Sequence, residues 1–350
     1  MGYVAPSANL QSRRAVTMAL FTIAVAGTIG VPMMMGGTAA FSAVLHLSLP
    51  GYVSIAALVS LNWIARTSKL LCLSRRLQVS ATFGQMFAVS LATDFGFMVT
   101  PTGVGGYAAS VHFLRRVGAS ASNAAAITAA DQLLDVLFFS LAVPIASVSL
   151  GWAIVPFKAL DAWWTTLAVI VAVALLLWVW RVFRWALRGA HRCPPALHRG
   201  ARKLADFGAR ALLDARTLMT GGARFTGGIL ALTVLQQMSR YGLLALIFEV
   251  LGYHVPLAIV FVLQTLVVQA AAFTGIPAGG GAAEIGLSAS FSQWLPGASL
   301  ASALFVWRVA TLYIGLVAGA VAMLWLSGKS FRSESNQPVA DGAVDARKKS

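Results

Sequence analysis

The amino-acid sequence predicts an all-α polytopic membrane protein, built as an inverted repeat of transmembrane helices with two re-entrant glycine-rich hairpins. Three observations lead to this prediction. First, 58% of the 350 residues are hydrophobic and only 11% are charged, whereas soluble domains contain about 25% charged residues. Second, the basic residues lie in short stretches between apolar segments. Third, a Pro-x-Gly-x-Gly sequence occurs twice inside apolar regions, at 101–105 and 277–281.

The apolar segments predict the positions of the helices. A chain of this length accommodates roughly eight spans of about 20 residues. We expect them near 15–36, 51–72, 80–99, 121–150, 163–182, 226–250, 256–274 and 299–327. Two short pieces, near 106–116 and 282–295, follow the two Pro-x-Gly-x-Gly sequences. Such a piece rises roughly 16–21 Å, too little to cross a hydrocarbon core of about 30 Å, so we expect two re-entrant hairpins.

The same pattern divides the chain into four regions. We expect a cytoplasmic N-terminus at 1–14, a first transmembrane repeat at 15–150 and a second at 151–328. The second repeat includes a basic amphipathic cytoplasmic segment at 183–224, whose apolar residues recur near helical spacing. The polar tail at 329–350 is expected to be disordered.

The placement of the positive charge predicts the orientation. The net charge is +15, and Lys and Arg lie near 13–14, 75–76, 115–116, 183–224 and the tail. Cytoplasmic loops carry this excess, so we expect a multi-pass protein of the bacterial inner membrane with both termini in the cytoplasm. This distribution argues against a nucleic-acid partner. The two cysteines, Cys72 and Cys193, cannot form a disulfide framework, and we expect free thiols.

Matching residues recur across the two halves at nearly constant offsets in residue number. With an offset of 176, Pro101, Gly103 and Gly105 match Pro277, Gly279 and Gly281, and Gln132 matches Arg308; with an offset of 174, Arg66 matches Arg240. The charge pattern gives the halves opposite orientations. Such an inverted-topology repeat is typical of transporters whose site lies near the midplane, where the broken helices meet.

The candidate site residues are those of the two glycine-rich breaks and the charged residues of the predicted spans. The substrate-binding candidates could hold an anionic head group through backbone N–H groups or guanidinium groups; they are Pro101, Gly103, Gly105, Arg240, Pro277, Gly279, Gly281 and Arg308. The candidates for charge balance or proton coupling are Asp94, Asp131, Asp135 and Glu284. We find no catalytic constellation, metal-ligand spacing or cofactor motif.

Each candidate also has a structural interpretation. The glycines equally allow tight helix packing. Arg308 could form an ion pair with Glu284 or Asp131, Arg66 could extend to the inner surface, and Asp131 could be solvated near its helix end. Because Glu284 and Arg308 align with uncharged residues, we expect the second half to carry most of any charged centre.

These motifs resemble those of a known family. The sequence from Pro277 to Glu284, followed by a helix bearing Arg308, looks like the second signature of the flippase-like transmembrane family that includes the membrane domain of lysylphosphatidylglycerol synthase. Residues 101–105 and 131–135 are similar to its first signature, and the resemblance covers most of 15–327. The chain departs from the family pattern at Gly106, Ala109 and Asp131-Gln132, where the family carries acidic and arginine residues.

The resemblance implies lipid handling without aminoacylation chemistry, because we expect no folded transferase domain after residue 328. Together with the buried charges, it predicts that the protein binds or translocates an amphipathic, phosphate-bearing lipid. Two alternatives remain open. One is a non-transporting accessory subunit that docks a lipid- or envelope-biosynthesis enzyme through 183–224. The other is an intramembrane lipid-modifying enzyme, which the lack of a nucleophile–base or metal constellation disfavours.

Overall fold

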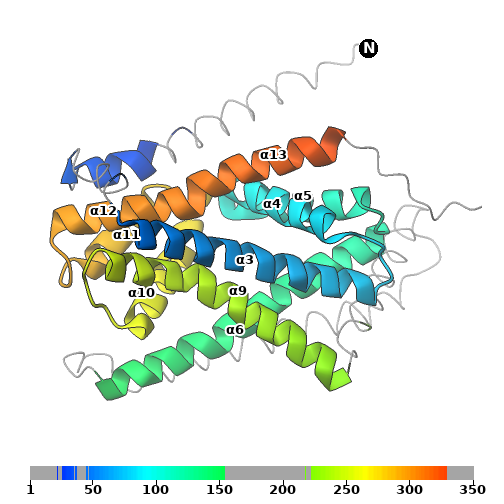
Figure 1. Ribbon diagram of the computed structural model, residues 1–350, viewed down its shortest axis with the longest axis horizontal. Helices are drawn as coiled ribbons and strands as arrows, with labels where there is room; N and C mark the ends of the chain where they lie inside the picture. Colours follow the sequence, from blue (N-terminus) through cyan, green and yellow to red (C-terminus); the bar gives the residue numbers. More distant parts are fainter. Residues whose placement is uncertain are drawn as a thin grey trace, which may run out of the picture.

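The computed structural model describes residues 26–34, 36–37, 47–153 and 222–328, with positions 22, 45 and 217. All regular structure in these ranges is helical (Figure 1). The predicted N-terminus at 1–14, the span at 163–182, most of the basic segment at 183–224, Cys193 and the tail at 329–350 lie outside the described residues. Cys72 is a free thiol, as expected.

The first half contains four α-helices and one short break: α3 (Leu49–Arg76), α4 (Phe83–Val99), the 3-10 turn η1 (Pro101–Gly103), α5 (Val104–Arg116) and α6 (Ala121–Ala153). Local sequence signals fix several of the ends. The Ser48 side chain accepts a hydrogen bond from the Gly51 amide at 3.2 Å and caps α3. Thr82 and Gln85 form a reciprocal capping box at the start of α4, which satisfies otherwise unpaired N–H groups.

The second half repeats this order with similar lengths: α9 (Gly222–Val250), α10 (Leu257–Ala272), the 3-10 turn η2 (Pro277–Gly279), α11 (Ala282–Phe291), α12 (Gly297–Arg308), the π-helical turn η3 (Val309–Tyr313) and α13 (Ile314–Gly328). In Figure 1, α12 and α13 form one long rod. The sequence predicted an uninterrupted span at 299–327; the structure places a π-helical turn in its middle, directly after Arg308.

Several helices have the length and composition of membrane spans. Within the described ranges, three qualify: Ala121–Val148, Gly222–Val250 and Gly297–Gly328. Phe83–Val99 and Leu257–Ala272 are shorter apolar helices. Helix α3 is long enough but carries four basic residues in its second half. Together with the composition, these helices identify a multi-pass membrane protein.

Two main hydrophobic clusters form the core, each centred on one half. The first joins mainly α3, α4, α5 and α6, includes Leu70, Met86, Val89, Leu114 and Ile127, and also contains buried residues of α9 and α13. The second joins α9, α10, α11 and α12, and includes Leu244, Phe248, Val260, Leu287 and Leu304. Helix α3 packs along both α4 and α9, and α13 packs along α4, so long helices of each half hold the two cores together (Figure 1).

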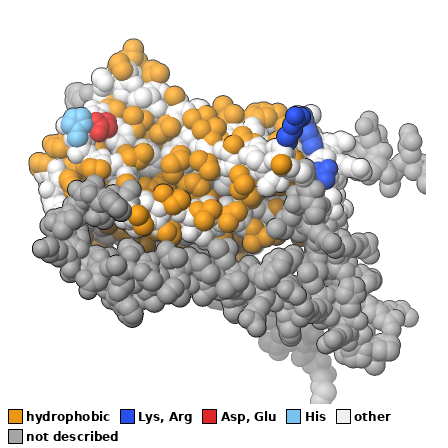
Figure 2. Space-filling view, turned by 90° about the horizontal axis from the view of Figure 1, so that it is seen from below, with side chains coloured by type: hydrophobic (Ala, Val, Ile, Leu, Met, Phe, Trp, Pro, Cys, Tyr) orange, Lys and Arg blue, Asp and Glu red, His pale blue; other side chains and the backbone are white. Residues whose placement is uncertain are grey.

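The exposed charges of the described residues lie at the two ends of the molecule, except for Arg240 within α9. Figure 2 shows a belt of hydrophobic side chains with Lys and Arg at one end and an acidic residue with a histidine at the other. The helix ends that carry exposed arginines are Arg75–Arg76 of α3 and Arg115–Arg116 of α5. Glu249 and His254, which form an exposed pair at 2.6 Å, lie where α9 leads into α10. This separation is typical of a protein embedded in a bilayer.

Candidate functional site

The two glycine-rich breaks share an unusual backbone conformation. In η1, Thr102 and Gly103 have φ of 55° and 73°. In η2, Ala278 and Gly279 have φ of 52° and 62°. A left-handed conformation at a residue other than glycine costs of order 1–3 kcal/mol and persists only where surrounding contacts enforce it. The same strained pair of residues therefore occurs at both breaks, at equivalent positions of the two halves.

The two breaks lie against each other. The turn η1 contacts η2, α4 contacts η2, and α10 contacts η1. The structure thus brings together Pro101, Gly103, Pro277 and Gly279, which lie far apart in the sequence. Gly105 and Gly281 follow at the starts of α5 and α11. Irregular backbone at membrane depth must be shielded by protein or line a wet cavity. Pro277 and Gly279 of η2 are buried, whereas η1 has no buried residue.

A hydroxyl group holds the first break. The Thr100 Oγ1 donates to the Gly96 carbonyl at 2.7 Å and accepts from the Gly105 amide at 2.9 Å. One side chain therefore ties the end of α4 to the start of α5 across η1. A neutral side chain therefore holds this break through its two hydrogen bonds.

A buried ion pair holds the second break. Arg308 Nε lies 2.5 Å from Glu284 Oε1, and Nη2 donates to Oε2 at 3.1 Å. Arg308 Nη1 donates to the Ala278 carbonyl at 3.1 Å, and the Gly281 amide donates to Glu284 Oε2 at 2.8 Å. Glu284 is 0% exposed and Arg308 4%. The structure thus selects Glu284, not Asp131, as the partner of Arg308, and uses both residues to fix η2.

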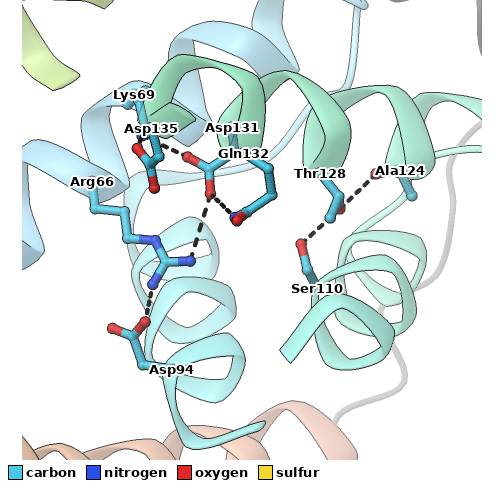
Figure 3. Close-up of polar contacts among 9 residues, drawn as sticks. All are labelled: Arg66, Lys69, Asp94, Ser110, Ala124, Thr128, Asp131, Gln132 and Asp135. Atoms are coloured by element: carbon cyan, nitrogen blue, oxygen red, sulfur yellow. Dashed lines mark hydrogen bonds and ion pairs between the residues drawn. The ribbon is translucent and has the colours of Figure 1, made fainter. Parts of the chain in front are cut away.

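A larger group of charges lies in the first half. We call it the charge cluster: Arg66 and Lys69 of α3, Asp94 of α4, and Asp131 and Asp135 of α6 (Figure 3). Lys69 Nζ lies 2.7 Å from Asp131 Oδ1 and 2.9 Å from Asp135 Oδ1. Arg66 pairs with Asp94 and reaches Asp131 Oδ2 at 3.5 Å. Gln132 also donates to Asp131 Oδ2, at 3.5 Å.

The charge cluster corrects three sequence-based expectations. Arg66 is 5% exposed and paired, so it does not extend to the inner surface. Asp131 is 3% exposed, so it is not solvated at a helix end. Among the described residues, the second half does not carry most of the buried charge, because two cations and three carboxylates lie in the first half against one ion pair in the second.

Lys69 is the site residue that the sequence reasoning missed. It is not among the candidates that the sequence pattern gives, yet it is 0% exposed and bridges two carboxylates of α6. A signal was present in the sequence. Lys69 lies three residues after Arg66, and Asp135 four after Asp131, so each pair shares one helix face.

Arg240 occupies a different environment from the other cations of the predicted spans. Its side chain is exposed, although Gln236, Gln237, Ser239 and Tyr241 around it in α9 are all buried. No ion pair links it to any described residue. Within the described ranges, no group of three or more His, Cys, Asp or Glu side chains could hold a metal ion.

Comparisons with known proteins agree with this architecture. A family model described as the lysylphosphatidylglycerol synthase TM region matches residues 15–319. One similar protein is a UPF0104 membrane protein of Archaeoglobus fulgidus, 22% identical over 278 residues. That alignment covers 75% of this chain and 82% of the archaeal protein. The family match includes both glycine-rich breaks, the charge cluster and the Glu284–Arg308 pair.

Proposed function

Because the chain belongs to the lysylphosphatidylglycerol synthase TM region family, we propose that it binds an amphipathic, phosphate-bearing lipid and moves it across the membrane. The observation that carries this proposal is the contact between η1 and η2, the turns that follow α4 and α10. In many transporters, discontinuous helices from two repeats meet at the substrate site. The proposed activity involves no covalent chemistry.

The helix boundaries support an inverted repeat. An offset of 174 carries α3 onto positions 223–250, and α9 spans Gly222–Val250. An offset of 176 carries α6 onto positions 297–329, and the rod from α12 to α13 spans Gly297–Gly328. The same offset of 176 carries the strained residues of η1 onto those of η2. A shared ancestry of the two halves explains these coincidences together.

The exposed charges support opposite orientations of the halves. The loop after α3 follows the exposed Arg75–Arg76, whereas the corresponding loop after α9 carries Glu249 and His254. By the positive-inside rule, the first loop faces the cytoplasm and the second faces away from it. We therefore propose that both termini lie on the cytoplasmic side of the inner membrane and that each short helix, α5 and α11, is a re-entrant return.

The proposed mechanism is alternating exposure of a polar path between the halves. Each half has its own ionic connection, the charge cluster in the first and the Glu284–Arg308 pair in the second. These connections keep the buried charges of each half paired as the path opens and closes. The lipid head group would follow the polar path, and the acyl chains would stay in the bilayer.

The charge cluster also supplies a site for charge balance. With every group ionised, Arg66 and Lys69 contribute +2 and the three aspartates −3, which leaves −1. Asp135 has the most exposed side chain of the three carboxylates, at 21%. A proton bound there would neutralise the cluster, so we propose Asp135 as the point at which proton binding couples to lipid movement.

The test is transbilayer movement of fluorescent lipids in liposomes that contain the pure protein. Lipids labelled on an acyl chain, with anionic, zwitterionic or uncharged head groups, are quenched from outside and followed over time. Protein-free liposomes and liposomes with an unrelated polytopic membrane protein are the controls. We expect faster movement of lipids with an anionic phosphate. No acceleration over either control for any lipid class would contradict translocation.

A further inference from the structure

Arg240 is exposed at a position where its helix is otherwise packed against the protein. Residues spaced three or four apart share one face of an α-helix, and Arg240 shares a face with Ile229, Thr233, Gln236 and Leu244. These four residues are 5%, 1%, 2% and 0% exposed. Arg240 alone in this row is exposed. Arg240 is therefore the exposed member of an otherwise packed row of α9.

The corresponding residue of the first half has acidic partners that Arg240 lacks. An offset of 174 relates it to Arg66, which is buried against Asp94 and Asp131. An offset of 176 relates these two carboxylates to Ala270 and Trp307. Ala270 is exposed, as Arg240 is. The second half therefore keeps the guanidinium group and replaces both of its acidic partners with neutral side chains.

At the position equivalent to Asp131 the second half has Trp307, whose indole can donate a hydrogen bond where a carboxylate accepts one. Trp307 is 4% exposed, and its indole Nε1–H has no hydrogen-bond partner among the described residues. It belongs to the same core as Leu243 and Leu244, about one turn from Arg240 in α9, and α12 contacts α9. A buried donor without a partner destabilises the protein, so a ligand that accepts this hydrogen bond would be stabilised by it.

Two buried amides lie beside Arg240 on the same helix. Gln236 and Gln237 precede it by four and three residues, and each is 2% exposed. The Oε1 atom of each lacks a hydrogen-bond partner in the described part of the chain. Because a side-chain amide can rotate to present its NH2 group, both residues can also donate to an anion. Two buried amides without a partner for their oxygen therefore lie beside an arginine that forms no ion pair with any described residue.

We propose that Arg240, the Trp307 indole and the amides of Gln236 and Gln237 bind the phosphate group of the lipid head group. This inference rests on the proposed function and names the site that would bind the phosphate group of the transported lipid. A guanidinium group binds phosphate through two parallel hydrogen bonds, and the external anion takes the place that the aspartates occupy beside Arg66. Arg308, whose three nitrogens all contact protein oxygens, is left to hold η2.

The test is ligand binding to the detergent-solubilised full-length protein, measured by native mass spectrometry and by thermal stabilisation. The probes are inorganic phosphate, short-chain phosphatidylglycerol and short-chain diacylglycerol, which separate free phosphate, phosphate lipid and uncharged lipid. We expect Arg240→Gln to weaken phosphatidylglycerol binding about tenfold or more, since a hydrogen bond to a charged group contributes about 1.5–3 kcal/mol. Arg75→Gln, at the exposed end of α3, is the matched control.

A second variant tests the same site without removing the arginine. Ala270→Asp restores the carboxylate that the first half has at Asp94, so we expect it to pair with Arg240 and to weaken phosphatidylglycerol binding while the protein stays folded. Binding by both variants at the wild-type level would overturn the site. Binding of inorganic phosphate as tight as that of the lipid would overturn its assignment to a lipid.

Measurements of lipid binding and of lipid movement also distinguish an error in the proposed site from an error in the proposed function. If the wild-type protein moves anionic lipids and Arg240→Gln moves them equally fast, the site is wrong and the function stands. If phosphatidylglycerol binds through Arg240 but the wild-type protein accelerates no lipid, the site stands and translocation is wrong.

Discussion

Lys69 shows how the meaning of a charged residue depends on distant parts of the chain. It lies two turns before the end of α3, close enough for a long side chain to extend toward water. The structure instead directs it inward, because α6 places Asp131 and Asp135 on the facing side. The sequence could identify both aspartates as candidates from their shared helix face. It could not identify their partner, since that depends on how α3 and α6 pack.

We predict that Lys69→Met strongly destabilises the protein. Removing one partner of a buried ion pair costs about 3–5 kcal/mol, because the remaining charge is left uncompensated. Here Asp131 and Asp135 would face each other with only Arg66 nearby. Thermal unfolding of the solubilised protein measures the effect, with Arg75→Met as the control at an exposed position of the same helix. Equal stability of the two variants would show that Lys69 does not compensate the buried carboxylates.

The breaks are the elements that the sequence predicted best. Proline and glycine act on their own backbone, so Pro101 and Pro277 indicated where α4 and α10 end and short helices follow, without any knowledge of packing. The π-helical turn η3 had no such signal, because Val309–Tyr313 contains neither residue. A π-helical turn adds one residue to a helical turn and is frequent at functional sites. Here it directly follows Arg308, in the long rod that α12 and α13 form at the end of the second half.

We predict that Gly279→Ala destabilises the protein more than a glycine substitution elsewhere. Gly279 has a φ of 62°, and a Cβ atom there would lie 2.8 Å from the Ala271 Cβ. The left-handed conformation costs about 1–2 kcal/mol for a residue with a side chain, and the close contact adds to that cost. Thermal unfolding and lipid movement should both respond.

Gly242→Ala is the control for this prediction. Gly242 lies inside α9 with no atom near the position of an added Cβ, and alanine favours a helix interior by about 0.8–1 kcal/mol. We therefore expect neutral or increased stability. If Gly279→Ala were tolerated as well as Gly242→Ala, η2 would not require its left-handed backbone.

At the scale of the whole molecule, the two halves combine similar frames with different chemistry. Both have a long first helix, a second helix that ends at a glycine-rich break, a short helix after the break and a long last helix or rod. The first half pairs its buried cations within the charge cluster, whereas the second uses Glu284 to hold η2 and leaves Arg240 exposed. The offset repeats and helix lengths could be read from the sequence. The division of roles between Arg240 and Arg308 could not, because it depends on which side chain reaches Glu284.

The proposed opposite orientation of the halves predicts that equivalent loops lie on opposite sides of the membrane. Ser80 lies in the loop between α3 and α4, and His254, its equivalent at an offset of 174, lies in the loop between α9 and α10; both are exposed. In a background with Cys72→Ala and Cys193→Ala, Ser80→Cys and His254→Cys each provide one reactive thiol. The His254 change breaks only an exposed pair with Glu249, which contributes little to stability.

We expect a membrane-impermeant thiol reagent added to intact cells to label His254→Cys and to leave Ser80→Cys unmodified until the membrane is permeabilised. Inside-out vesicles should give the reverse pattern, because the basic end of α3 faces the cytoplasm. Labelling of both positions from one side would mean that α3 and α9 enter the membrane in the same direction. The halves would then be related by a parallel repeat, and η1 and η2 could not return to opposite faces of the bilayer.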